Sequence, residues 1–225
     1  MTVRRVCLVG ASGLVGSAVM AAAVGRDDLR LIAVARGEVP LPAAARMEVL
    51  VGAPERWGEL IEAARADVLV CALGTTIARA GSEKAFRAVD HDLVLATARA
   101  ARACGIAHFV LVSSVGADSA SRNFYLSVKG ETEVALMKLG FERLDVVRPG
   151  LLLGKRAEKR KLEGLGQILG PLANLAVLHG KARRFRSVRA TRLGRALLGL
   201  ALENAKGRFV HEYDGIRRAQ RRFGE

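Results

Sequence analysis

Short apolar runs alternate along the chain with longer stretches in which apolar residues recur every three or four positions. The short runs are almost continuously apolar, as buried parallel strands are, and they predict strands over 3–10, 29–36, 47–52, 67–74, 108–114, 143–150 and 208–213. The longer stretches have helical spacing and predict helices over 12–25, 55–65, 82–104, 124–139 and about 191–204. Such alternation is typical of successive βαβ units, so we expect an α/β fold with a parallel sheet.

Turn and capping residues set several of these boundaries. Ser82 is a candidate N-cap for the helix over 82–104, and Gly105 and Gly140 follow two helices where a left-handed residue is expected. Beyond residue 150 the pattern weakens. We expect a single domain over 1–225, with a small substrate cap drawn from about 151–190 and a disordered tail over 217–225, because that tail has few apolar residues to bury.

The uncharged run over residues 6–25 could be a signal peptide or a membrane span, since Arg4 and Arg5 precede it. Its glycines favour another interpretation. Gly10, Gly13 and Gly16 recur every three residues where a strand gives way to a helix, as in a dinucleotide-binding turn. We therefore expect no transmembrane segment and a cytoplasmic protein.

Charge divides the chain unevenly. Residues 1–121 carry 13 Lys and Arg against 12 Asp and Glu, whereas residues 122–225 carry 23 against 10. A basic half could attract an acidic substrate, a nucleic acid or an anionic membrane, but a solvated arginine-rich surface is the simplest explanation. The basic stretch over 181–195 has one aromatic residue and no known nucleic-acid-binding motif, which argues against nucleic acid. The three cysteines have no CxxC spacing, so no metal is expected.

The turn GASGLVG supplies what a pyrophosphate needs. Glycine allows the tight turn and the close approach of the backbone, and the start of the following helix offers free N–H groups and a positive dipole. The residues expected to bind the cofactor here are Gly10, Ser12, Gly13, Leu14, Val15 and Gly16. Arg36 stands at the end of the second strand, where an NAD-binding site would have a carboxylate. A guanidinium there suits a 2′-phosphate, so NADP(H) is expected in preference to NAD(H).

Tyr125 and Lys129 are four residues apart in a predicted helix, so their side chains lie on one face. A phenol has an ordinary pKa of about 10 and needs a neighbouring cation to act as an acid or base near neutrality. A serine at the end of the fifth strand would complete such a site by donating to the substrate oxygen. Ser113 and Ser114 both fit this position.

With the glycine turn, the segments ALGTT (72–76), SSVGAD (113–118), FYLSVKGETE (124–133) and RPGLLLG (148–154) resemble the short-chain dehydrogenase/reductase superfamily. The similarity is to its atypical, Tat-interacting-protein-like members and covers roughly residues 3–204. The resemblance implies a Rossmann-type doubly wound parallel sheet, bound NADPH, and a reductase triad of Ser114, Tyr125 and Lys129. It also implies that the cofactor lies along Leu73, Gly74, Thr75, Pro149, Gly150 and Leu151.

Two positions depart from the family pattern. Residues 51–53 are Val-Gly-Ala where many relatives have an aspartate near adenine, and Asp90 stands where extended members usually have asparagine. The region after residue 150 is short for an extended member, so no sugar-nucleotide site is inferred.

The sequence thus predicts an NADPH-dependent reductase of a small carbonyl substrate. The alternative is a regulatory or redox-sensing protein that binds NADPH and acts through protein partners. Basic residues after the sixth strand could line the substrate entrance and select an anionic carbonyl, or could be exposed surface charge: Lys155, Arg156, Lys159, Arg160 and Lys161. The sequence does not define the oligomeric state.

Overall fold

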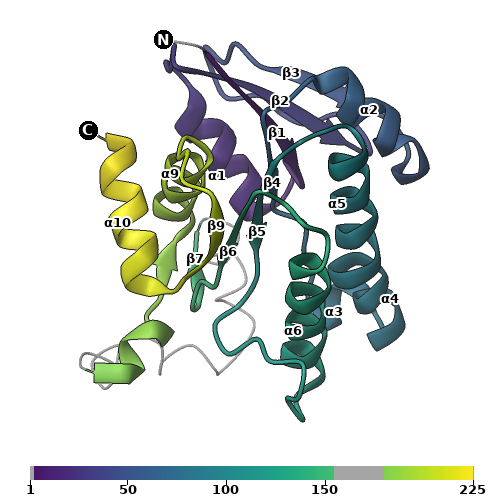
Figure 1. Ribbon diagram of the computed structural model, residues 1–225, viewed down its shortest axis with the longest axis vertical. Helices are drawn as coiled ribbons and strands as arrows, with labels where there is room; N and C mark the ends of the chain where they lie inside the picture. Colours follow the sequence, from purple (N-terminus) through teal and green to yellow (C-terminus); the bar gives the residue numbers. More distant parts are fainter. Residues whose placement is uncertain (1–2, 155–179, 225) are drawn as a thin grey trace.

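The computed structural model describes residues 3–154 and 180–224, and its centre is a seven-stranded parallel sheet (Figure 1). The strand order is β3-β2-β1-β4-β5-β6-β9, which confirms the predicted doubly wound α/β fold. All seven strands fall within predicted apolar runs or within a residue of them. They are β1 (Arg4–Val9), β2 (Leu29–Ala35), β3 (Glu48–Val51), β4 (Val68–Cys71), β5 (His108–Val112), β6 (Arg143–Val147) and β9 (Gly207–His211).

Helices cover both faces of the sheet (Figure 1). One layer holds α1 (Leu14–Ala23), α9 (Ala190–Ala201) and α10 (Tyr213–Gly224), and the other holds α2 (Trp57–Ala64), α5 (Val94–Ala103) and α6 (Phe124–Met137). Successive strand residues enter opposite layers: Val68 and Val70 pack in the first core, Leu69 and Cys71 in the second. Burial on both faces explains why the strand runs are apolar throughout.

The predicted helix over 82–104 is present but is not uniform. It begins with α4 (Glu83–Arg87), whose N-cap Ser82 accepts a hydrogen bond from the Ala85 N–H at 3.1 Å, and it ends before Gly105, whose φ is +78°. Between α4 and α5 lies a π-helical turn, η2 (Ala88–Leu93). Turns of this kind often occur at functional sites, and this one carries the buried Asp90.

The predicted disorder of the chain's end is wrong up to residue 224. Helix α10 buries Ile216, Ala219 and Phe223, which recur three and four residues apart on one face. The guanidinium of Arg26 lies 4.3 Å from the centre of the Phe223 ring, which adds a cation–π contact. Three apolar residues at helical spacing are enough to hold an arginine-rich helix, because its charged residues can remain on the outer side.

The expected substrate cap is described only at its ends. A short strand β7 (Leu152–Leu153) pairs in parallel with β8 (Val188–Arg189), and a 3₁₀ helix, η4 (Gly180–Phe185), precedes β8. The predicted basic stretch over 155–161 and apolar stretch over 165–178 lie outside the described residues.

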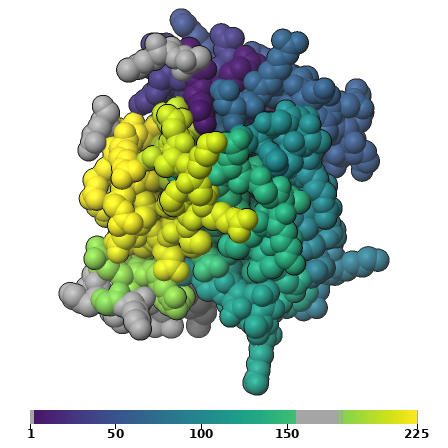
Figure 2. All heavy atoms as spheres, in the orientation of Figure 1, coloured from purple at the N-terminus to yellow at the C-terminus, as the bar shows by residue number. Residues whose placement is uncertain are grey.

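Residues 180–224 form a basic side of the molecule. They carry 13 Lys and Arg against 3 Asp and Glu, and Figure 2 shows these green-to-yellow segments together, beside the teal and blue segments that precede them in the sequence. Within the described ranges, no helix is both long and apolar enough to cross a bilayer.

Candidate active site

The turn after β1 requires glycine at its first position. Gly10 has φ of +91°, and a methyl group there would lie 2.6 Å from the carbonyl carbon and oxygen of Ala72. A methyl group at Gly16 would collide with the carbonyl oxygen of Gly10. The ends of β1 and β4 and the first turn of α1 are therefore packed backbone against backbone.

The start of α1 fits a phosphate group. Its N-cap is Gly13, which has no side chain to satisfy the first N–H groups, and the first turn contains no acidic residue. The amide of Gly13 is itself held 3.1 Å from the Gly10 carbonyl oxygen, which fixes the turn. The uncapped N–H groups include those of the predicted residues Leu14 and Val15.

Arg36 follows β2 at the same edge of the sheet. Val9 of β1 is in register with Val34 of β2, so Arg36 lies beyond the carboxyl end of β2, next to the glycine turn. Its side chain is exposed. An exposed guanidinium beside the turn is available to a ligand bound there.

The loop after β4 links the glycine turn to α6. Leu73 lies against Gly10, since the Leu73 amide nitrogen would be 2.8 Å from a methyl group there. One residue later, a methyl group at Gly74 would lie 3.7 Å from the ammonium of Lys129. The loop after β4 thus lies between the predicted phosphate turn and the ammonium of the predicted catalytic lysine.

Tyr125 and Lys129 both project from α6, but their surroundings differ. The half-buried Tyr125 ring packs against Phe86 of α4, with 5.4 Å between ring centres. The Lys129 side chain is buried, and its ammonium forms an ion pair of 2.8 Å with the carboxylate of Asp90. This partner was not predicted, because nothing local in the sequence connects η2 with α6.

The two serines after β5 have different partners. The hydroxyl of the buried Ser113 donates to Glu133 of α6, and Glu133 in turn accepts from Arg148 at 3.0 Å. That hydrogen bond to Glu133 raises the pKa of Arg148. Ser114 is half-buried, and its hydroxyl makes one long contact, 3.4 Å, to the Val115 carbonyl oxygen. Of the two hydroxyls, that of Ser114 is free to meet a substrate.

The segment after β6 lies at the same edge of the sheet as the glycine turn and Ser114. The Pro149 carbonyl oxygen accepts a hydrogen bond of 3.0 Å from the Val115 N–H, which places residues 149–151 beside Ser114. Gly150 packs against the backbone of Phe185 and Arg186, and a methyl group there would collide with both carbonyl oxygens. Leu151 is 63% exposed, so it is available to a ligand.

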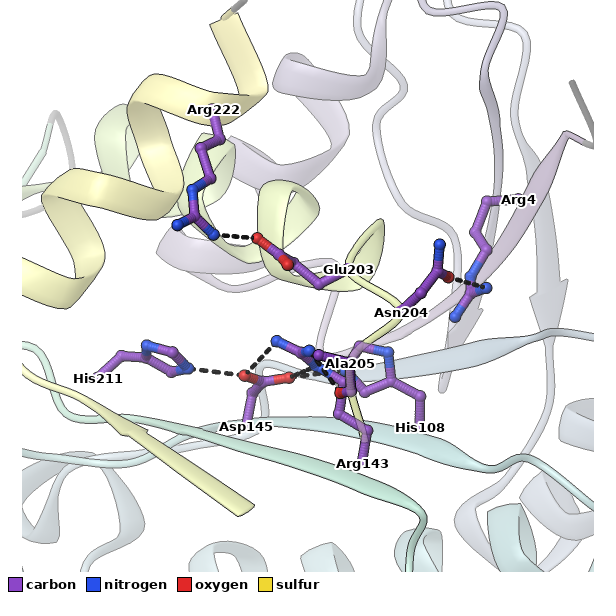
Figure 3. Close-up of polar contacts among 9 residues, drawn as sticks. All are labelled: Arg4, His108, Arg143, Asp145, Glu203, Asn204, Ala205, His211 and Arg222. Atoms are coloured by element: carbon purple, nitrogen blue, oxygen red, sulfur yellow. Dashed lines mark hydrogen bonds and ion pairs between the residues drawn. The ribbon is translucent and has the colours of Figure 1, made fainter. Parts of the chain in front are cut away.

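A second polar cluster lies toward the amino ends of β5 and β6, away from this edge (Figure 3). The fully buried carboxylate of Asp145 accepts hydrogen bonds from His108 at 2.7 Å, His211 at 2.6 Å and Arg143 at 2.7 Å. It joins three neighbouring strands, and no motif in the sequence predicts it. In the part of the chain that the structure describes, no three His, Cys, Asp or Glu side chains are grouped as a metal site would require.

A glycine turn between the first strand and first helix of a parallel sheet is the architecture of Rossmann-type dinucleotide-binding proteins. Comparison with known families gives the same class, because the family model described as NAD(P)H-binding matches residues 10–167. The chain belongs to this NAD(P)H-binding family and is an atypical member of the short-chain dehydrogenase/reductase superfamily, as predicted.

Two curated relatives illustrate the similarity. The chain is 32% identical to the mitochondrial protein FMP52 of Candida albicans over 206 residues, 89% of each chain. It is 38% identical to HTATIP2 of Rattus norvegicus over 168 residues, which is 73% of this chain and 69% of the relative.

Solved structures share the fold at low identity. The enzyme WbmH of Bordetella bronchiseptica, in complex with NAD⁺, has a TM-score of 0.67 at 13% identity, covering 93% of this chain and 75% of that one. The UDP-Glc/GlcNAc 4-epimerase of Campylobacter jejuni has a TM-score of 0.70 at 10% identity, covering 97% and 82%.

The predicted cytoplasmic location is wrong by this comparison. The FMP52 relatives from Candida albicans and Coccidioides immitis are both labelled mitochondrial. The prediction rested on excluding a signal peptide and a membrane span. A protein that lacks both can still be delivered to an organelle, so these two exclusions do not define its compartment.

Proposed function

We propose that this chain is an NADP(H)-dependent oxidoreductase that reduces a carbonyl group of a small substrate. The observation that carries the proposal is that the backbone of Leu73 lies against Gly10, while the next residue, Gly74, lies beside the side-chain ammonium of Lys129. This arrangement puts the predicted phosphate turn and the predicted catalytic helix at one edge of the sheet, where ligands of such folds bind. When bound there, the cofactor would supply a hydride from its nicotinamide ring.

Residues of three segments would hold the cofactor. The glycine turn, from Gly10 and Ser12 to Gly16, would bind the pyrophosphate through N–H groups and the α1 dipole. Leu73, Gly74 and Thr75 after β4, and the segment 149–151 after β6, would lie along the nicotinamide half.

The triad would act on the substrate oxygen. The Ser114 hydroxyl would donate a hydrogen bond to the carbonyl oxygen and polarise it. The Tyr125 hydroxyl would give its proton to that oxygen as hydride reaches the carbon. Lys129 would place a positive charge beside the phenol and hold the nicotinamide ribose.

Exchange of Tyr125 for phenylalanine tests the catalytic assignment. We expect Tyr125→Phe to lower NADPH oxidation with an accepted carbonyl substrate by about 10²–10⁴-fold, while the Kd for NADPH stays within about twofold, because the phenol is assigned to proton transfer. Fluorescence titration and a carbonyl panel provide the two measurements. Tyr213→Phe is the matched control, since Tyr213 is the only other tyrosine.

Unchanged turnover in Tyr125→Phe would refute the triad. Cofactor binding without turnover of any carbonyl in the wild type would favour the regulatory alternative.

Arg36 is proposed to select NADP(H). Replacing it with alanine would remove a charge-assisted hydrogen bond to a 2′-phosphate, so we expect NADPH affinity to fall about tenfold or more while NADH affinity changes little. Dissociation constants for both dinucleotides, in wild type and Arg36→Ala, measure this difference. Equal affinity of the wild type for NADPH and NADH would contradict the proposed selection of NADP(H) by Arg36.

A further inference from the structure

A pocket lies at the amino ends of the central strands, on the edge of the sheet opposite the glycine turn. Its volume of about 370 Å³ is in the range of small-molecule sites. Arg4, His108 and Arg143, the first residues of β1, β5 and β6, line it together with the turns before β4, β5 and β9. The described wall contains no residue of the candidate active site, so the proposed function does not account for this pocket.

The carboxylates in the wall of this pocket have partners within the fold. They are Asp67, which accepts a hydrogen bond of 2.7 Å from the Arg5 N–H, Glu142, which pairs with Lys206 at 2.7 Å, and Glu203, which pairs with Arg222 at 2.5 Å. An incoming anion would therefore meet carboxylates that are already hydrogen-bonded or ion-paired.

Arg4 is a cation of the wall that pairs with no carboxylate of the described residues, whereas Arg143 pairs with Asp145. The Arg4 guanidinium donates to the side-chain oxygen of Asn204 at 3.3 Å (Figure 3), and its Nε is buried without a hydrogen-bond partner in the described part of the chain. A neutral amide leaves the positive charge of Arg4 uncompensated, and a buried N–H without an acceptor is costly. Arg4 therefore favours an anionic oxygen in this pocket.

His108 supplies a buried acceptor to the same pocket. The residue is 3% exposed, and its Nε2 lies 2.7 Å from the Asp145 carboxylate. Figure 3 shows His108 on the side of Asp145 that faces Arg4 and Asn204, with His211 on the other side. An ionised carboxylate can only accept, so Nε2 carries the proton and Nδ1 of the neutral ring holds a lone pair. Among the described residues, this Nδ1 has no hydrogen-bond partner.

Burial keeps the His108 ring neutral. It lowers the pKa of His108 below 6.5 against the opposing hydrogen bond to Asp145, and the positive charges of Arg143 and Arg4 lower the pKa further. The effect of Arg4 also shows that its charge lies near the ring. Above pH 6.5 the pocket thus presents a cationic donor at Arg4 and a neutral acceptor at His108.

We propose that this pocket binds hydrogen phosphate, a small oxyanion that also carries a hydroxyl group. One anionic oxygen would accept from the Arg4 Nε–H, and the P–OH group would donate to His108 Nδ1. The NH₂ group of Asn204, whose oxygen is held by Arg4, offers a further donor. A fully ionised oxyanion of the same shape has no hydrogen for Nδ1 and would place an oxygen against its lone pair.

Comparison of anions by isothermal titration calorimetry tests the role of the hydroxyl group. At about pH 7.5 His108 is neutral, inorganic phosphate keeps a hydroxyl, and a phosphate monoester has lost its own, since its second pKa is about 6. We expect a Kd of about 1 mM or lower for inorganic phosphate and binding about tenfold or more weaker for sulfate and for methyl phosphate. Absence of phosphate binding would overturn the proposal, and so would sulfate or methyl phosphate binding as tightly as phosphate.

Two substitutions in the wall test the location of the ligand. Arg4→Gln removes the cationic donor. His108→Gln keeps an N–H that can donate to Asp145 but has no acceptor in place of Nδ1. We expect either change to weaken phosphate binding about tenfold or more, and His108→Gln to reduce the preference for phosphate over sulfate. Arg30→Gln is the matched control, because Arg30 is an exposed arginine of the neighbouring strand β2 that does not line the pocket, and it should bind phosphate as the wild type does.

The same variants exclude the other phosphate-binding candidate, the glycine turn at the opposite edge of the sheet. Phosphate binding that is unchanged in both Arg4→Gln and His108→Gln would place the ion outside this pocket and overturn the proposal. Circular dichroism melting checks that each variant folds. If His108→Gln does not fold, Arg4→Gln against Arg30→Gln, with NMR of the His108 ring nitrogens in the wild type, remains a complete test, since bound phosphate should shift the Nδ1 resonance and sulfate should not. An unmoved Nδ1 resonance at saturating phosphate would contradict the assigned contact. None of these measurements depends on the proposed reductase activity.

Discussion

At the residue scale, two adjacent serines have different hydrogen-bond partners and therefore different roles. Ser113 is buried, and its hydroxyl belongs to a network with Glu133 and Arg148 that ties the ends of β5 and β6 to α6. Ser114 is half-buried and has only a long contact to its neighbour's carbonyl oxygen. One hydroxyl therefore maintains structure, and the other is proposed to meet the substrate.

Alanine at each serine should separate these roles. Ser113→Ala leaves Glu133 without one of its donors, so we expect the free energy of unfolding to fall by about 1–3 kcal/mol. Ser114→Ala should lower NADPH oxidation about 10²-fold or more with little change in stability, because it removes a donor to the substrate oxygen. Urea unfolding and carbonyl reduction measure the two effects. The opposite pattern would assign the catalytic serine to position 113.

At the scale of elements, Asp145 joins β5, β6 and β9 (Figure 3). Burial by itself raises the pKa of Asp145, but hydrogen bonds from His108, His211 and Arg143 more than offset it, so the pKa lies well below its ordinary value of 3.8. Burial lowers the pKa of His108 below 6.5, although Asp145 opposes that shift. The folded protein thus favours a neutral His108 and an ionised Asp145.

Both shifts predict loss of stability in acid. The unfolded chain binds a proton at His108 more readily than the folded chain, so stability should decline as pH falls below about 6.5. The ionised Asp145 contributes stability above pH 3.8 that is lost as pH falls further toward its folded pKa. Urea unfolding at a series of pH values from 8 down to about 3 measures the slope.

Asp145→Asn tests whether Asp145 causes the loss of stability at the acid end of that pH series. The substitution leaves Arg143 and two histidines without their carboxylate, so we expect a loss of about 3–5 kcal/mol near neutral pH and a flatter curve below pH 4. Glu142→Gln is the control, because Glu142 is a surface carboxylate that pairs with the exposed Lys206. A wild-type slope in Asp145→Asn would locate the acid sensitivity elsewhere.

At the scale of the whole molecule, the last helix completes one of the two layers. Helix α10 packs on α9, and Gly199 of α9 lies so close to it that a methyl group there would be 2.5 Å from the Ala219 carbonyl oxygen. Ile216 and Phe223 enter the same core as Met20 of α1 and Leu193 of α9. The end of the chain is therefore part of the fold that supports the glycine turn.

Removing one buried ring from α10 should show how much this helix contributes to the free energy of unfolding. Phe223→Ala removes core contacts and the cation–π partner of Arg26, so we expect a loss of about 3–5 kcal/mol in the free energy of unfolding. Arg221→Ala, on the exposed side of the same helix, should change stability by less than about 0.5 kcal/mol. Equal stability of the two variants would mean that α10 does not hold its layer in solution.

The sequence predicted those helices and strands well whose limits depend on residues close together in the chain. The apolar runs marked all seven strands of the sheet, and Ser82 and Gly105 marked the limits of a helix, because burial and capping act over a few residues. The π-helical turn inside that helix was not predicted, since no residue type specifies it. The tail was missed because its arginines outnumber the three apolar residues that dock it.

The sequence by itself determined the parallel α/β sheet, the glycine turn after its first strand and the family, since these follow from periodicity and from residues close together in the chain. Only the tertiary structure showed that Ser113 donates to Glu133, that Lys129 pairs with Asp90, and that Asp145 joins three strands. Those pairings link residues far apart in sequence, and their partners become neighbours only when the parallel strands and their crossover helices are stacked. Burial then makes each pairing obligatory, because a charged group removed from water must find its partner inside the fold.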